Sequence, residues 1–140
     1  MTLFISEKRK KSLLKNIIIY IGITLFIAIF GIVYEQYSHN VYSFHMWFAW
    51  IWVLCFGVVP YLLLYFLPIT KVPGSVSETT YNLGVAMLTT RSIFIGVIDI
   101  YGTTNRTMVI VYTVISIVFL VSGFLMYITA MLIDKFKAKE

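Results

Sequence analysis

The sequence predicts an all-α membrane protein in which four transmembrane helices form an up-down-up-down bundle, within a single domain spanning residues 1–140. Hydrophobic residues make up 60% of the chain and charged residues only 12%, whereas soluble proteins average roughly 45–50% and 25%. Four apolar stretches also have about the 20 residues that a helix needs to cross a bilayer. A water-soluble domain of this length could not bury so much apolar surface.

The four helices are predicted at about 16–34, 44–67, 81–101 and 108–133. The first is long for the apolar region of a signal peptide and lacks a small-x-small cleavage site, so we expect a retained signal-anchor helix. The second contains Pro60, which removes a backbone donor. We therefore expect a kink there that leaves the Phe56 carbonyl without its usual partner. Short connections make neighbouring helices antiparallel.

Positive charge predicts the orientation. Nine of the eleven lysine and arginine residues lie before the first helix, after the fourth, or between the second and third, and the opposite loops hold only Arg106. Because positive residues resist translocation, both termini are predicted to be cytoplasmic. The basic clusters adjoin apolar segments, so we expect the lipid bilayer rather than nucleic acid as their partner.

The third predicted helix is the most polar of the four. Unpaired polar groups cost several kcal/mol in hydrocarbon, so we expect this helix to be the most buried. Arg91 lies ~15 Å into the membrane, and an arginine at that depth indicates either a functional site or a structural residue bound to backbone carbonyls. We expect its guanidinium to point toward the carbonyls near Phe56. The candidate ligand-binding or pathway residues on this helix are Arg91, Asp99, Asn82 and Thr90.

A second group of polar residues is predicted at the outer boundary and comprises Glu35, His39, His45 and Asp99. Carboxylates and imidazoles can bind zinc, iron or copper, or can relay protons. Alternatively they are ordinary interfacial residues, because their spacing matches no established ligand motif. Haem ligation by one of the histidines is a further alternative, although the core offers no second histidine. The sequence names no cofactor.

No catalytic residue is identified, and an enzyme is not predicted. The chain lacks the GxSxG, HExxH, P-loop and GxGxxG motifs, which argues against hydrolase and nucleotide-binding functions. Its single cysteine, Cys55, excludes an internal disulfide framework and a thiolate metal cage.

Three segments, Tyr34–Ser43, Thr89–Phe94 and Ile100–Asn105, resemble a pattern in small uncharacterised four-helix membrane proteins of Gram-positive bacteria. The resemblance implies a bacterial plasma membrane and brings no activity. Small multidrug-resistance transporters are similar in size, but they depend on a glutamate deep in their first helix. The corresponding core here, residues 17–33, contains no acid.

Two functional hypotheses follow from the polar third helix. The first is a non-enzymatic membrane module, either an accessory subunit of a membrane-protein partner or a helix bundle that binds an anionic or quinone-like headgroup through Arg91. The alternative is a small transporter or channel that works as a homo-oligomer, such as a homodimer. In that case Arg91 and Asp99 lie along the path, with Glu35 and His39 at its outer mouth.

Overall fold

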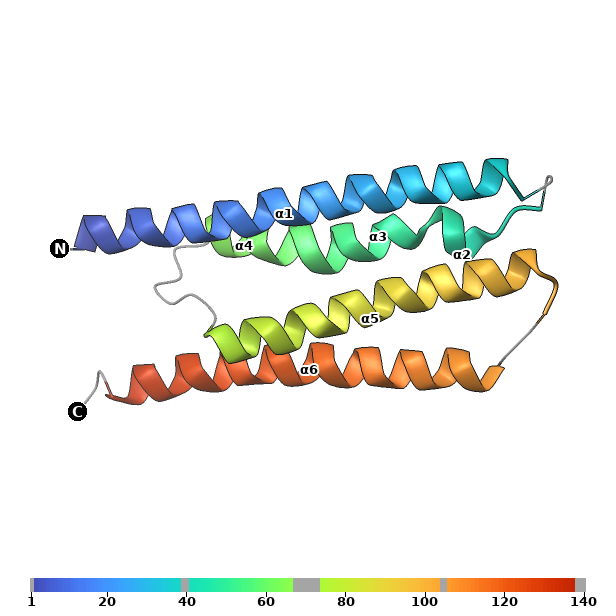
Figure 1. Cartoon of the computed structure of the whole chain (residues 1–140). Coiled ribbons are helices and arrows are strands. Elements are labelled where there is room, and N and C mark those ends of the chain that lie inside the picture. The colour runs from blue at the N-terminus through green and yellow to red at the C-terminus, as the bar shows by residue number, and fades with distance from the viewer. Residues whose placement is uncertain (1, 39–40, 67–73, 104–105, 138–140) are drawn as a thin grey trace.

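The structure, a computed structural model, describes residues 2–38, 41–66, 74–103 and 106–137, and every regular element in these ranges is a helix (Figure 1). In chain order they are α1 (Thr2–Gln36), α2 (Phe44–Trp47), α3 (Ala49–Val53), the π-helical segment η1 (Leu54–Val58), α4 (Val59–Phe66), α5 (Ser75–Ile100) and α6 (Arg106–Lys137). Four helical stretches are long and apolar enough to cross a membrane: Lys10–Gln36, Ala49–Phe66, Ser75–Ile100 and Arg106–Ile133. The all-α prediction with four helices of spanning length is thus confirmed.

Three helices extend beyond the apolar stretches that predicted them. α1 begins at Thr2 rather than at residue 16, α5 begins at Ser75 rather than at residue 81, and α6 ends at Lys137 rather than at residue 133. The single helix predicted at 44–67 is wrong at its start, because a turn at Phe48 separates α2 from α3. Helical hydrogen bonding does not depend on hydrophobicity, so a helix continues into polar residues that favour it, such as lysine and glutamate. The extension of α5 matters for the site, because it adds a polar first turn.

The second span is irregular where proline was expected to disturb it. In η1, the Val59 amide donates to the Leu54 carbonyl, five residues earlier, and Pro60 follows directly. Prolines and π-bulges are both recognised causes of helix kinks, and here they are adjacent. The kink itself, with the Phe56 carbonyl left without its usual partner, stays a prediction.

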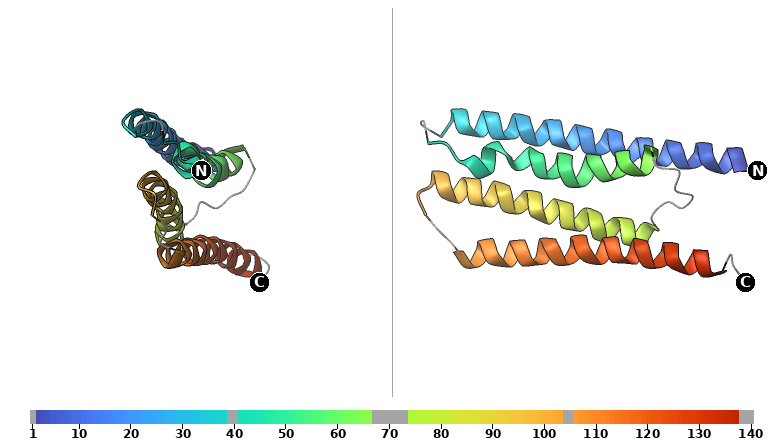
Figure 2. Two further views of the ribbon diagram at one scale, coloured as in Figure 1. Left: turned by 90° about the vertical axis from the view of Figure 1, so that its right-hand side faces the viewer. Right: turned by 180° about the vertical axis from the view of Figure 1, so that it is seen from behind.

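The helices are arranged in a row. α1 packs against α2, α3, η1 and α4, and α5 packs against α2, α3 and η1 on the other side. Among the described residues, α6 packs against α5 and against no other helix. Figure 2, left, shows this end on, with α6 separated from α1. α5 is the most buried span and α6 the least, which confirms the prediction for the polar third helix.

Glycines set the closest helix contacts. A Cβ atom on Gly84 would lie 2.6 Å from the Leu120 amide nitrogen, and one on Gly123 would lie 2.6 Å from the Tyr81 amide nitrogen. α5 and α6 therefore approach through a reciprocal pair of glycine contacts. Such small residues let helices in membranes pack backbone to backbone.

Candidate functional site

The N-terminal turns of α5 carry a half-buried polar network. Glu78 and Asn82 are four residues apart and so share one face of the helix. The Asn16 amide on α1 donates to Glu78 Oε1. The Tyr20 hydroxyl donates to Asn82 Oδ1 at 2.7 Å, and the Tyr61 hydroxyl lies 3.1 Å from Glu78 Oε1 and 3.2 Å from Asn82 Oδ1. We call Asn16, Tyr20, Tyr61, Glu78 and Asn82 the Glu78 network.

Packing fixes the two tyrosines of this network. Tyr20 and Tyr61 stack with ring centroids 5.6 Å apart. The Tyr20 ring lies against Gly57 in η1, where a Cβ atom would overlap it. Because the Tyr61 hydroxyl has one proton and two acceptors within reach, it can bind either Glu78 or Asn82. The network therefore joins α1, α4 and α5 through tyrosine side chains whose positions are fixed by packing.

A cavity of about 380 Å³ lies beside the network, between α4, α5 and α6. We call it the Glu78 pocket. Its walls include Tyr61 and Leu63 of α4, Glu78 and Tyr81 of α5, and Phe124 and Tyr127 of α6. The size falls within the range of roughly 300–1,000 Å³ that is usual for small-molecule sites, and the lining is almost entirely apolar.

Glu78 supplies the pocket's negative charge. Its position in the first turn of α5 is favourable for a carboxylate, because the amino end of a helix carries partial positive charge. The ion pair found among the described residues joins His45 to Asp99 at the other end of the helices. No lysine, arginine or histidine side chain that the structure describes pairs with Glu78, and Lys71 lies outside the described residues.

The sequence hypotheses included only Asn82 from this site. Glu78 was missed because the third helix was predicted to begin where the apolar run begins, at residue 81. The spacing Ser75-x-x-Glu78 matches a capping box and could have indicated the earlier start. In the structure the cap residue is Gly74, no side chain caps the helix, and Glu78 binds residues of α1 and α4 instead.

The predicted boundary residues lie at the opposite end of the helices. Glu35 Oε1 accepts from the Ser43 amide at 3.3 Å, and the Ser43 hydroxyl donates to Asp99 Oδ2 at 2.8 Å. His45 Nδ1 lies 3.1 Å from the same Asp99 oxygen. The structure thus links three of the four predicted residues through Ser43, which the sequence did not suggest, whereas His39 lies outside the described residues.

Within this linked group Glu35 is buried, and its Oε2 atom has no hydrogen-bond partner. Across the described parts of the chain, no three His, Cys, Asp or Glu side chains gather closely enough to hold a metal ion. The described members of the group, Glu35, His45 and Asp99, therefore form a chain of hydrogen bonds with Ser43.

The partner expected for Arg91 was wrong. Its Nε donates to the Thr113 hydroxyl of α6, not to carbonyls near Phe56. Ser92 faces α2, since its hydroxyl donates to the His45 carbonyl at 2.7 Å. The next residue along a helix is rotated by about 100°, so Arg91 faces α6. Thr90 binds the Ala86 carbonyl of its own helix, at 2.8 Å.

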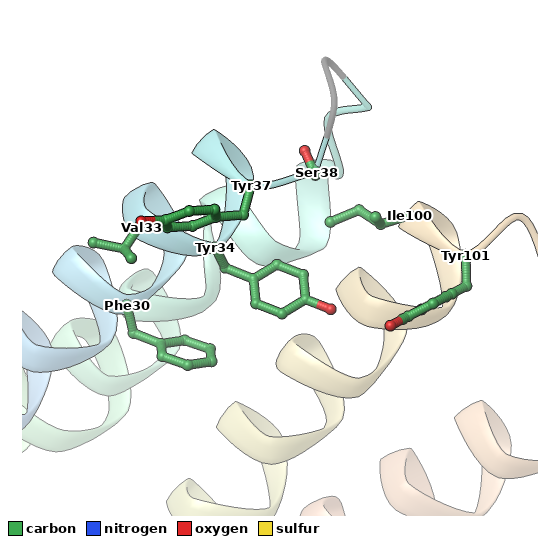
Figure 3. Close-up of a pocket in the computed structure, with 7 residues that line it drawn as sticks. All are labelled: Phe30, Val33, Tyr34, Tyr37, Ser38, Ile100 and Tyr101. Atoms are coloured by element: carbon green, nitrogen blue, oxygen red, sulfur yellow. The ribbon is translucent and has the colours of Figure 1, made fainter.

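A larger cavity, of about 570 Å³, lies between the ends of α1 and α5. Figure 3 shows Tyr34 of α1 and Tyr101, just after α5, extending toward each other across it. Its lining contains three tyrosines and no charged side chain. Tyrosine is the residue expected where a membrane protein meets the headgroup region, so these phenols need no ligand to explain them.

Comparison with protein families, curated proteins and solved structures finds no match to this chain. The fold and the Glu78 pocket define a protein with four helices of membrane-spanning length and a cavity of small-molecule size.

Proposed function

We propose that this protein is a non-enzymatic integral membrane module that binds a small ligand in the Glu78 pocket. The observation that carries the proposal is a carboxylate, oriented by hydrogen bonds from α1 and α4, at the edge of an apolar cavity. Leu63 and Phe124, which line the cavity, are each 56% exposed. The pocket therefore opens toward the lipid-facing surface, and a ligand can enter it from the bilayer.

The pocket is a better candidate than Arg91, around which the sequence hypotheses placed the function. The cavity beside Arg91 measures about 10 Å³, which holds no more than one water molecule. Arg91 also has a side-chain partner in Thr113. The same two facts weaken the alternative of a channel or transporter with Arg91 and Asp99 along its path.

The proposal includes an orientation: a multi-pass protein of the bacterial plasma membrane, with up-down-up-down helices and cytoplasmic termini. It is supported by the positions of the first turn of α1 and the last turn of α6, which lie at the same end in Figure 1. Lys10 belongs to the basic cluster near that end and lies over the Tyr65 ring, 5.9 Å from its centroid. The Glu78 network is then on the cytoplasmic side of the bilayer.

Reporter fusions test this orientation. We expect cytoplasmic signals from fusions after Lys71 and Glu140, and external signals from fusions after Asn40 and Gly102. A cytoplasmic signal from the Gly102 fusion would contradict the four-span arrangement.

Photolabelling tests the binding site. Adamantane diazirine, a compact apolar probe, should label the pocket residue Phe124 saturably in micelles of dodecyl maltoside. Replacing Leu63 by Trp fills the pocket mouth and should abolish the saturable part of the labelling. Leu25→Trp is the matched control, since Leu25 is 59% exposed on α1 and lies outside the pocket. Labelling of Phe124 that is unsaturable, or equal in both variants, would refute a binding site here.

A further inference from the structure

We propose that the ligand of the Glu78 pocket is a lipophilic organic cation, such as a quaternary ammonium with an apolar substituent. This inference rests on the proposed function, because it names the chemical class that the same pocket accepts. Two features of the pocket carry it: the sign of its charge and the aromatic composition of its walls.

Glu78 sets the sign of the pocket's charge. An ionised carboxylate in a medium of low dielectric constant is unfavourable unless a cation or several donors compensate it. Asn16 and Tyr61 both contact the same oxygen, Oε1, so they orient the carboxylate without supplying a positive charge. No basic side chain that the structure describes completes an ion pair there. A cationic ligand would pair with this half-buried carboxylate, whereas an anion would be repelled.

The walls of the pocket supply the second argument. Three tyrosines and a phenylalanine, Tyr61, Tyr81, Tyr127 and Phe124, surround the cavity. The faces of aromatic rings attract cations, and aromatic cages are a recurrent means of binding quaternary ammonium groups. Ser77 also lines the pocket, but its hydroxyl is bound to the Gly123 carbonyl at 2.7 Å. The remaining walls are suited to the apolar part of such a ligand.

Two isosteric probes separate charge from shape. Benzyltrimethylammonium and neopentylbenzene differ only in the replacement of a cationic nitrogen by a neutral carbon. Each is titrated against adamantane diazirine labelling of Phe124 in micelles of dodecyl maltoside. For each probe, the affinity of the wild type is divided by the affinity of Glu78→Gln. Partition of the probe into detergent affects both affinities equally, so it cancels in this ratio.

We expect the ratio for the cation to be about ten or more, and the ratio for the neutral probe to be close to one. Asp99→Asn is the matched control: it removes one carboxylate charge at the other end of the helices and should leave both affinities unchanged. Equal ratios for the two probes would overturn the cationic ligand but leave a binding pocket. Failure of both probes to compete would remove the proposed function as well.

A second variant covers the case in which Glu78→Gln does not fold. Tyr127→Leu removes one aromatic wall of the pocket and keeps Glu78. It should weaken competition by the cation by a larger factor than competition by the neutral probe. Equal changes for the two probes would overturn the inference.

Discussion

Replacing Gly123 by Ala tests how α6 is held to the rest of the protein. The added Cβ would lie 2.6 Å from the Tyr81 amide nitrogen and 2.8 Å from its Cα atom, both in the backbone of α5. To reach an ordinary contact of 3.4 Å, the two helices must separate by roughly 0.8 Å. No side-chain rotation can relieve this contact.

The cost of that separation has two parts. Overpacking of this kind destabilises by about 1–3 kcal/mol. The hydrogen bond from the Ser77 hydroxyl to the Gly123 carbonyl, now 2.7 Å, would lengthen to about 3.5 Å, the limit of such a bond. Its loss adds about 1 kcal/mol. We therefore expect the docking of α6 onto α5 to weaken by about 2–4 kcal/mol.

The labelling rate of a thiol introduced by Ser116→Cys reports how often α6 detaches from α5. Ser116 is fully buried on α6, whose neighbour is α5, so a thiol there reacts only when α6 detaches. In a Cys55→Ala background, Gly123→Ala should increase its labelling rate on the order of 30- to 1,000-fold, since 1.4 kcal/mol is a factor of ten. Gly22→Ala is the control, because it makes the same change on α1 with no atom within 4 Å of the new Cβ. Equal labelling rates in the two variants would refute the reasoning.

Three further predictions concern the interior. Asn82→Ala removes the acceptor of the Tyr20 hydroxyl, while Tyr61 can still donate to Glu78, and should destabilise the protein by about 1–3 kcal/mol in a detergent unfolding titration. An unchanged midpoint would contradict the network. Gly57→Ala places a Cβ atom against the Tyr20 ring and should lower the free energy of unfolding by about 1–3 kcal/mol. In a Tyr20→Ala background most of this destabilisation should vanish. A destabilisation that persists there would place the clash elsewhere. Thr113→Val removes the acceptor of Arg91 and should weaken the docking of α6 onto α5 by about 1.5–3 kcal/mol. The labelling rate of the cysteine at position 116 measures this change, and an unchanged rate would show that Arg91 finds another acceptor.

Hydropathy was sufficient to predict the four spans, because each needs only a long run of apolar residues. It also predicted that α5 is the most buried span, since a helix that carries Asn82, Arg91 and Asp99 cannot face lipid on every side. These properties depend on composition and not on the rotation of one helix against another. They could therefore be obtained without knowledge of the packing.

The partners of the polar residues depend on rotation, and there the sequence was insufficient. Depth alone made the carbonyls near Phe56 a reasonable partner for Arg91. Arg91 binds Thr113 instead, because the opposite side of α5 packs against α2, where Gly96 leaves room for Met46. A one-residue rotation of a helix redirects each side chain by about 100°. Only the assembled helices determine that angle.

The Glu78 network was missed for a different reason. A hydrophobicity criterion ends a span where polar residues begin, so it excludes the turn that contains Glu78. The same turn is continuous with α5 as a helix. A helix start signal such as Ser75-x-x-Glu78 marks a polar first turn that hydrophobicity alone excludes.

The attachment of α6 to α5 alone has a consequence for the order of assembly. Among the described residues, the hydrogen bonds around Glu78 join α1, α4 and α5, those around Asp99 join α1, α2 and α5, and neither group includes a residue of α6. During synthesis α6 emerges after α5, so these polar groups can find their partners before α6 has entered the membrane. The arrival of α6 then adds the wall that contains Phe124 and Tyr127. The cavity beside Glu78 is thus the last part of the protein to be completed. Departure of α6 would leave the hydrogen bonds around Glu78 and Asp99 intact but would remove the partners of Arg91 and Ser77.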